Sequence, residues 1–172
     1  RFTAWCMHHF EPKLAASVDR AIAVSVPDRD ALLARNPNLN VPVVPNGVDT
    51  RTLRPLPPST AKPALLFVGA LAYRPCEDAV LWLAQQILPL VWRRHPDLEA
   101  WIVGHSPTQA IRRLADRRIH VTGTVADVTP YYQAAHMAVA PLRAGGGSRL
   151  KILEAMALGR PVVSTTIGAE GI

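Results

Sequence analysis

Residues 137–165 read MAVAPLRAGGGSRLKILEAMALGRPVVST, and this stretch decides the fold. Its first five residues are apolar and predict a short buried strand, and residues 161–165 predict another. Between them, residues 148–158 carry apolar side chains at helical spacing, and Gly159 and Pro161 then end the helix. A strand, a helix and a second strand in this order are typical of a parallel β-α-β unit.

The same alternation extends towards the N-terminus as far as residue 64. Further strands are predicted at residues 64–69, 100–104 and 119–123, and further helices at 77–94, 107–116 and 128–135. Pro89 lies inside the first of these helices and should kink it. Strands that are apolar throughout are buried on both faces, so the sequence predicts an α/β fold with a doubly wound parallel sheet.

The first 63 residues have a different pattern. Two short strands are predicted at residues 21–26 and 41–45, with a helix at 27–35 between them. Residues 53–63 then hold four of the 16 prolines of the chain, which is typical of a linker between domains.

A glycine-rich loop carries the densest functional signal. Three consecutive glycines lie between a buried strand and a helix, where free backbone N–H groups make a ready site for an anion such as phosphate. Neighbouring basic side chains add positive charge, and the loop matches neither the P-loop nor the G-x-G-x-x-G pattern. The residues of this candidate phosphate site are Arg143, Gly145, Gly146, Gly147, Ser148, Arg149 and Lys151.

Glu154 lies on the helix that follows, among apolar residues. A carboxylate in such surroundings is costly unless it is paired. One interpretation is an i, i+3 ion pair with Lys151, and the other is an acceptor for ligand hydroxyls such as those of a ribose. The residues alone leave both open.

Other loops at the carboxyl ends of the predicted strands are also candidates, because doubly wound sheets bind ligands there. We therefore expect functional residues just after Gly69, Gly104, Gly123 and Pro141. The loop from Gly69 to Arg74 also fits a tight turn. The turn from Gly123 to Val125 either offers backbone groups to a base or only ends a strand.

Composition excludes several classes of protein. The chain is 49% hydrophobic and 19% charged, which is globular, and no apolar run approaches the ~20 residues of a membrane-spanning helix. The net charge of +6 comes from scattered arginines rather than a nucleic-acid-binding stripe. The cysteines and histidines lack metal-ligand spacing. Because the chain starts at Arg1, we expect it to be a piece of a longer protein.

Three stretches resemble a known family. FVGALAYRPCEDAV (67–80), VTGTVADVTPYY (121–132) and GGGSRLKILEAMALGRPVVSTTIGAEGI (145–172) resemble the C-terminal domain of GT-B fold glycosyltransferases, most of all the retaining family-4 enzymes called glycosyl transferases group 1. The resemblance implies the truncated end of an acceptor-side domain at 1–48, itself Rossmann-like, and a linker at 49–63. It implies a Rossmann-like nucleotide-sugar-binding domain at 64–172, incomplete at its C-terminus.

The resemblance also implies roles for the candidate residues. A nucleotide-diphosphate sugar would be the donor, with its base near Gly123 and Val125 and its ribose on Glu154. Its diphosphate would lie on the glycine-rich loop, and no cofactor or bound metal is expected. Gly69 and Arg74 complete the expected donor site.

Two departures from the family pattern are visible. The family's additional glutamate, eight positions before the helix glutamate, is replaced here by Gly146. The basic pair that the family often has in the first loop corresponds to Ala70 and Pro75, and Arg74 is a candidate substitute for the lysine. The family's catalytic residues on the acceptor side would precede Arg1.

The resemblance predicts a hexosyltransferase-type enzyme that transfers sugar with retention of configuration. This chain would hold mainly the donor-binding half and be inactive alone. The expected acceptor is lipid-linked, a polysaccharide or a small molecule, with peripheral membrane association of the full-length protein. A cytoplasmic location is expected, with the inner face of the membrane as an alternative. The alternative functions are a nucleotide-sugar epimerase or hydrolase of the same fold and a non-catalytic nucleotide-sugar-binding module.

Overall fold

The computed structural model describes residues 10, 13–14, 17–146 and 148–172. By compactness the chain divides into two units. The first comprises residues 1–47, 146–149 and 170–172, and the second comprises residues 48–145 and 150–169. The second unit contains the sheet.

The first unit contains the helix α2, Val26–Leu33. Ser25 caps it, because its side chain accepts a hydrogen bond from the backbone N–H of Asp28 at 3.2 Å. Pro27 stands in the first turn, where its missing N–H costs nothing. The helix confirms the prediction at residues 27–35 to within two residues at each end.

The two strands predicted in this unit were wrong beyond one residue pair. A single parallel bridge joins Ala23 to Val43, and the Ala23 N–H donates to the Pro42 carbonyl at 3.1 Å. The physical reason on one side is that Pro42 has no N–H group to donate to the Ala21 carbonyl, although the Ala21 N–H still donates to the Asn40 carbonyl at 3.1 Å.

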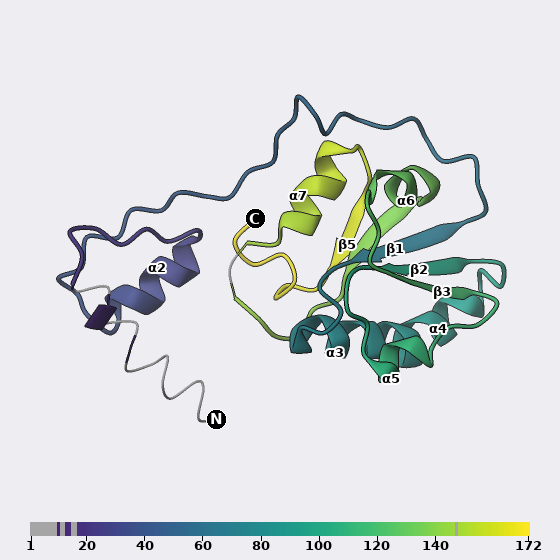
Figure 1. The fold of residues 1–172 in the computed structure, drawn as a ribbon, viewed down its shortest axis with the longest axis horizontal. Helices are drawn as coiled ribbons and strands as arrows, with labels where there is room; N and C mark the ends of the chain where they lie inside the picture. Colours follow the sequence, from purple (N-terminus) through teal and green to yellow (C-terminus); the bar gives the residue numbers. More distant parts are fainter. Residues whose placement is uncertain (1–9, 11–12, 15–16, 147) are drawn as a thin grey trace. The chain divides into compact units, whose positions relative to one another are not determined.

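The second unit is built on five parallel strands, in the order β3-β2-β1-β4-β5 (Figure 1). The strands are β1 Ala64–Val68, β2 Glu99–Val103, β3 Ile119–Gly123, β4 Met137–Ala140 and β5 Val162–Ser164. This is the Rossmann-like order, and it confirms the predicted doubly wound α/β sheet.

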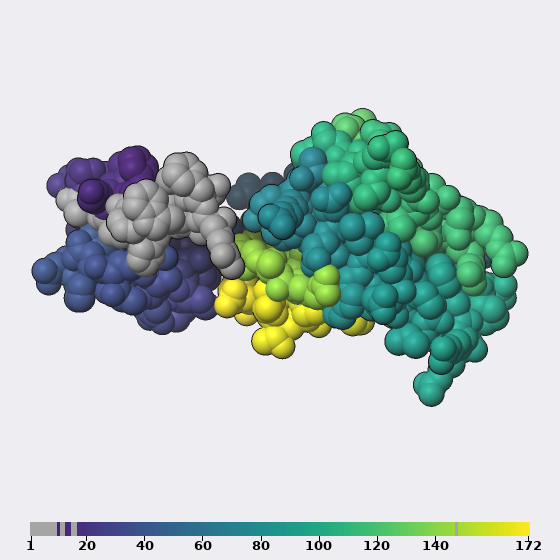
Figure 2. All heavy atoms as spheres, turned by 90° about the horizontal axis from the view of Figure 1, so that it is seen from below, coloured from purple at the N-terminus to yellow at the C-terminus, as the bar shows by residue number. Residues whose placement is uncertain are grey.

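Helices cover both faces of the sheet, as Figure 1 shows. One face carries α3 Arg74–Trp82, η1 Leu83–Ile87, α4 Leu88–Trp92 and α5 Gln109–Arg112. Figure 2 looks from that side and shows the side chains of these helices in teal to green. The other face carries α6 Thr129–Ala134 and α7 Leu150–Ala157. Each face of the sheet has its own hydrophobic core. Because successive strand residues point to opposite faces, Phe67 packs in the core under α3, η1, α4 and α5, and Leu66 packs in the core under α6 and α7.

Pro89 marks an irregularity in the long helical run from α3 to α4. A proline ring clashes with the carbonyl four residues earlier, which here belongs to Gln85. The run widens into the π-helical turn η1 just before Pro89, and this proline then stands in the first turn of α4. The predicted kink therefore takes the form of a local change of helix type.

The other helices differ from prediction mainly at their ends. The helix predicted at 107–116 is the single turn α5, and α7 begins at Leu150 rather than Ser148. Thr108 caps α5, because its side-chain oxygen accepts from the Ile111 N–H at 3.4 Å.

Residues 49–63, predicted as a linker, are closely attached to the sheet unit. Leu53 and Leu56 pack against the core on the α6–α7 face, and the Leu56 N–H donates to the Leu158 carbonyl at 3.0 Å. The buried Arg160 donates to the Tyr132 carbonyl at 2.8 Å and also to the Pro57 carbonyl. The domain boundaries themselves stay a prediction.

Candidate functional site

The strand order places a ligand crevice between β1 and β4. From β1 the chain continues to β2 and β3, which lie on one side of β1 in the sheet. It then returns to β4, which lies on the other side of β1. In such sheets the loops after the two strands diverge and leave a crevice at their carboxyl ends. Here those loops are the one that begins at Gly69 and the glycine-rich loop after Ala140.

Glycines let the backbone segments approach closely at this carboxyl edge. The Gly69 N–H donates to the Val103 carbonyl at 3.0 Å, and the Gly104 N–H donates to the Gly123 carbonyl at 3.3 Å. A Cβ on Gly104, where φ is +153°, would lie only 1.7 Å from the Gly69 carbonyl oxygen. Only glycine can therefore occupy position 104 without displacing the loop after β1.

Lys151 brings a positive charge to the loop after β1. This residue lies in the first turn of α7, and its Nζ lies 2.9 Å from where a Cβ on Gly69 would stand. The same Nζ lies 3.7 Å from the Cys76 Sγ and 4.3 Å from the centre of the Phe67 ring. Two predicted site residues, Gly69 and Lys151, are thus brought together.

Arg143 follows β4 and is paired. Its guanidinium donates two hydrogen bonds to the Asp78 carboxylate, at 2.6 and 3.0 Å, and lies 5.1 Å from the Trp82 ring centre. The hydrogen bond from Arg143 lowers the pKa of Asp78 below its usual 3.8, against a smaller opposing effect of burial. Arg74 and Arg143 line the same open hollow of about 450 Å³, together with Pro75, Asp78 and Ala144.

Glu154 stands half-buried on α7. Within the described residues its carboxylate makes no hydrogen bond or ion pair, so the structure gives no support to the ion-pair interpretation. Burial, and secondarily the charge of Glu154, raise the pKa of Tyr132 well above its usual 10.0. The Tyr132 hydroxyl donates to the Lys151 carbonyl at 3.3 Å, which ties this neutral phenol to the first turn of α7.

Three other predicted residues belong to the first unit. The Asn46 side-chain amide donates to the Ser148 hydroxyl at 2.7 Å, and Arg149 donates to the Gly146 carbonyl. Gly145 ends the adjoining stretch of the sheet unit with φ +117°, which favours glycine. Gly147, also predicted, lies outside the described residues.

The turn after β3 contains the last two predicted residues. Gly123 adopts φ +76° with nothing within 4 Å of a hypothetical Cβ, so the space beside it is open. Val125 is half-buried and packs against the core on the α6–α7 face. Gly123 therefore reaches the carboxyl edge, whereas the side chain of Val125 serves mainly packing.

Sequence reasoning missed Asp78 and Phe67 as neighbours of the site. Asp78 contacts Arg143 and Phe67 contacts Lys151. In both pairs the two residues are far apart in the sequence. Glu77 also escaped notice, although it accepts a hydrogen bond from the Thr108 hydroxyl at 2.6 Å and so links α3 to the loop after β2. Acidic residues opening a helix after a glycine loop were the signal that could have found both carboxylates.

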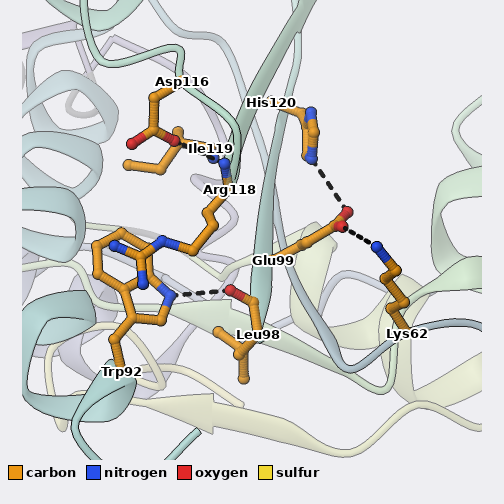
Figure 3. A network of polar contacts seen from close by, with 8 residues as sticks. All are labelled: Lys62, Trp92, Leu98, Glu99, Asp116, Arg118, Ile119 and His120. Atoms are coloured by element: carbon orange, nitrogen blue, oxygen red, sulfur yellow. Dashed lines mark hydrogen bonds and ion pairs between the residues drawn. The ribbon is translucent and has the colours of Figure 1, made fainter. Parts of the chain in front are cut away.

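The opposite, amino edge of the sheet carries a second polar cluster (Figure 3). Glu99, at the start of β2, accepts from His120 at 3.0 Å and pairs with Lys62 at 3.8 Å. The Asp116 carboxylate accepts from the backbone N–H groups of Arg118 and Ile119, both at 2.7 Å. These hydrogen bonds fix the turn that leads into β3.

Trp92 completes this cluster from the end of α4. Its indole N–H donates to the Leu98 carbonyl at 2.8 Å, and the Arg118 guanidinium lies 3.6 Å from its ring centre. Most polar groups of this cluster are thus satisfied within the chain, although the buried Nε of Arg118 has no hydrogen-bond partner among the described residues.

An apolar cavity of about 590 Å³ lies between the α3–α4 segment and strands β1, β4 and β5. Its ionisable lining residues are His95 and His136, and the rest of its lining is mostly aliphatic. It lacks the cations that the carboxyl edge offers, so it does not fit an anionic ligand.

Among the described residues no group of three or more His, Cys, Asp or Glu side chains could hold a metal ion. In the same part of the chain no helix is long and apolar enough to cross a membrane.

Solved structures resemble this fold. A TarM mutant of S. aureus, in complex with Fondaparinux, alpha-GlcNAc-glycerol and UDP, matches 92% of this chain with a TM-score of 0.76 and 17% identity. Anabaena Alr3699/HepE, in complex with UDP and glucose, matches 95% with a TM-score of 0.70 and 21% identity. The pneumococcal O-GlcNAc transferase GtfA, in complex with UDP and GlcNAc, matches 93% with a TM-score of 0.70 and 19% identity. At these identities the likeness shows the GT-B fold alone.

This chain spans only part of the proteins that it resembles. It covers 32% of the TarM chain, 50% of the HepE chain and 32% of the GtfA chain. An uncharacterized 44.6 kDa protein in the cps region of Klebsiella pneumoniae is 28% identical over an alignment of 116 residues, and the match covers 62% of this chain and 30% of that protein.

The sequence family described as glycosyl transferases group 1 matches residues 62–172, which is more than half of the chain and includes the whole sheet. This match agrees with the order of the strands and with the crevice between β1 and β4. The chain belongs to the glycosyl transferases group 1 family.

Proposed function

We propose that this chain is the donor-binding half of a glycosyltransferase and takes a nucleotide-diphosphate sugar at its carboxyl edge. The observation that carries the proposal is the position of the Lys151 ammonium, which lies against Gly69 in the crevice between β1 and β4. Because Gly69 has no side chain, an anionic phosphate can approach the backbone and the ammonium closely.

Each part of the donor has a proposed partner. The diphosphate is bound by Lys151, beside the open backbone of Gly69. Arg74 and Arg143 add positive potential beside it, from the hollow that they line. The two carboxylate oxygens of Glu154 accept hydrogen bonds from the ribose hydroxyls, and the turn at Gly123 contacts the base.

The proposed reaction breaks the bond between the anomeric carbon and a diphosphate oxygen. A new bond forms from that carbon to the oxygen of an acceptor hydroxyl, whose proton passes to the leaving diphosphate, and the anomeric configuration is retained. Negative charge develops on the leaving diphosphate, where fixed cations and backbone N–H groups stabilise it most. We propose no bound metal for this step, and an acceptor-binding half supplies the remaining groups.

Calorimetry with UDP-glucose, UDP-N-acetylglucosamine and GDP-mannose tests donor binding by this chain. We expect at least one to bind, and Glu154→Ala to weaken that binding about tenfold or more, since hydrogen bonds to charged groups contribute roughly 1.5–3 kcal/mol. The exposed Glu170 gives a matched control, because Glu170→Ala removes the same group outside the sheet unit. Equal affinities for wild type and Glu154→Ala would reject the assignment of the ribose site.

Activity needs a protein that joins this chain to an acceptor-binding half. NMR of the anomeric proton of the product, followed from the first minutes, distinguishes retention from inversion. An excess of EDTA should leave the rate unchanged if no metal takes part. Inversion, or epimerised sugar without transfer, would contradict the proposed reaction.

A further inference from the structure

Two neutral side chains contact the Lys151 ammonium at the carboxyl edge. Phe67, fully buried in β1, presents its ring 4.3 Å from the ammonium, and Cys76, buried in the first turn of α3, presents its sulfur at 3.7 Å. These three residues come from three different elements. They meet where Gly69 leaves room, because a Cβ there would stand 2.9 Å from Nζ and 3.2 Å from Sγ.

Neutral partners have a different effect on a cation from charged ones. Arg143 is held by the Asp78 carboxylate, which places a negative charge beside its guanidinium. An aromatic face and a thiol orient an ammonium by weaker attraction and leave its charge uncancelled by them. Phe67 and Cys76 thus contact Lys151 without adding a negative charge, whereas Asp78 adds one beside Arg143.

We infer that Phe67 and Cys76 are positioning residues, which aim the Lys151 ammonium at the diphosphate of the donor. The inference rests on the proposed function, because it names what holds the cation of that site. Gly69 belongs to the same arrangement, since any side chain there would displace the ammonium or the thiol.

The geometry can be tested without a ligand. The chain has only three lysines, so isotope-labelled lysine gives a simple NMR spectrum. The ring of Phe67 should shift the Lys151 side-chain protons upfield, and Phe67→Leu should remove that shift. Lys62, which is 78% exposed, is an internal control and should not move. If Lys151 shows no ring-current shift in the wild type, the inference is overturned, whatever the protein binds.

Ligand binding tests the purpose of the arrangement. UDP and GDP are added to the labelled chain, and the bound nucleotide should perturb Lys151 while leaving Lys62 unchanged. Phe67→Leu should weaken binding roughly three- to tenfold, the range of a partly desolvated cation–π contact, and Cys76→Ala should weaken it less. In a Lys151→Met background both substitutions should lose their effect on binding, which a merely structural role would not predict.

A conservative change in the same core is the matched control. Ile111→Val removes one methylene from the buried cluster that contains Phe67, and it should leave the affinity unchanged. If a nucleotide binds and leaves Lys151 unperturbed, the inference is overturned while the proposed function survives. If neither nucleotide nor any donor sugar binds, the proposed function fails, and the role of Phe67 and Cys76 in donor binding fails with it, even where the ring-current shift is present.

Discussion

The two edges of the sheet use polar residues in opposite ways. At the amino edge, Glu99 and Asp116 accept hydrogen bonds from neighbours in the chain, and Trp92 binds a carbonyl and stacks on a guanidinium. At the carboxyl edge, glycines replace side chains, and two cations lie beside the loops after β1 and β4.

The difference separates residues that stabilise the fold from residues available to a ligand. A polar cluster that satisfies itself gains stability and has little left to offer a ligand. A loop of glycines loses the packing that side chains would provide, but a ligand can approach its backbone closely. Substitutions at the amino edge should therefore change the free energy of unfolding, and substitutions at the carboxyl edge should mainly change ligand binding. The exception is a glycine that is itself packed.

Gly104→Ala should give the largest effect. Gly104 lies at the carboxyl edge, and yet its substitution should mainly lower the stability of the fold. Its Cβ would lie 1.7 Å from the Gly69 carbonyl oxygen, so either the loop moves or the chain fails to fold. We expect a loss of about 3 kcal/mol or more in the free energy of unfolding, measured by urea denaturation. Gly123→Ala is the matched control at the same edge, because only its φ of +76° opposes a side chain, and it should cost about 1 kcal/mol. Equal costs would show that close packing at Gly104 is unimportant.

Trp92→Leu should sharpen the comparison from the amino edge. The variant loses the hydrogen bond to the Leu98 carbonyl and the stacking of Arg118, so we expect a loss of about 2 kcal/mol in stability. The affinity for the donor nucleotide should not change. Lys62→Ala provides a control in the same cluster, since its exposed pair with Glu99 should contribute little. A fall in nucleotide affinity in Trp92→Leu would remove the distinction between the two edges.

Asp78→Asn should give the smallest effect, a slight loss of stability above pH 3.8 that disappears in acid. The hydrogen bond from Arg143 holds the pKa of Asp78 below 3.8, so the pair stabilises the folded state at higher pH and this contribution is lost as pH falls from 3.8 through the folded-state pKa. Asp78→Asn should flatten that part of the curve of Tm against pH. Both side chains are largely exposed, at 50% and 41%, which keeps the effect small. Arg143→Gln should flatten the curve in the same way, and an unchanged curve in either variant would contradict the pairing.

The apolar runs made the strands of the sheet predictable. β1 and β3 lie within one residue of the ranges predicted from sequence, because strands buried on both faces need continuous apolar residues. The same reasoning failed at residues 21–26 and 41–45, where the apolar pattern is present but Pro42 removes a donor that the ladder requires. The number of available backbone N–H donors, rather than hydropathy, therefore limits how far those two segments can pair as strands.

The candidate site was predictable only in part. Glycines and cations could be found because their residue types are unusual after buried strands. The partners of the cations could not, because Arg143 and Asp78 are 65 positions apart and no local spacing encodes their contact. The approach of Lys151 to Gly69 likewise depends on where α7 crosses the end of β1, which is a property of packing.

The segment before β1 shows that protection from solvent does not require regular secondary structure. Residues 49–63 contain neither helix nor strand, and yet the Leu56 amide is bonded to the Leu158 carbonyl while Arg160 holds the Pro57 carbonyl. Amide hydrogen exchange at Leu56 should therefore be slow, and proteases should find residues 53–57 a poor substrate. For anyone dividing this chain into pieces, the natural cut lies before residue 48, and a cut at residue 63 would strip away part of the core.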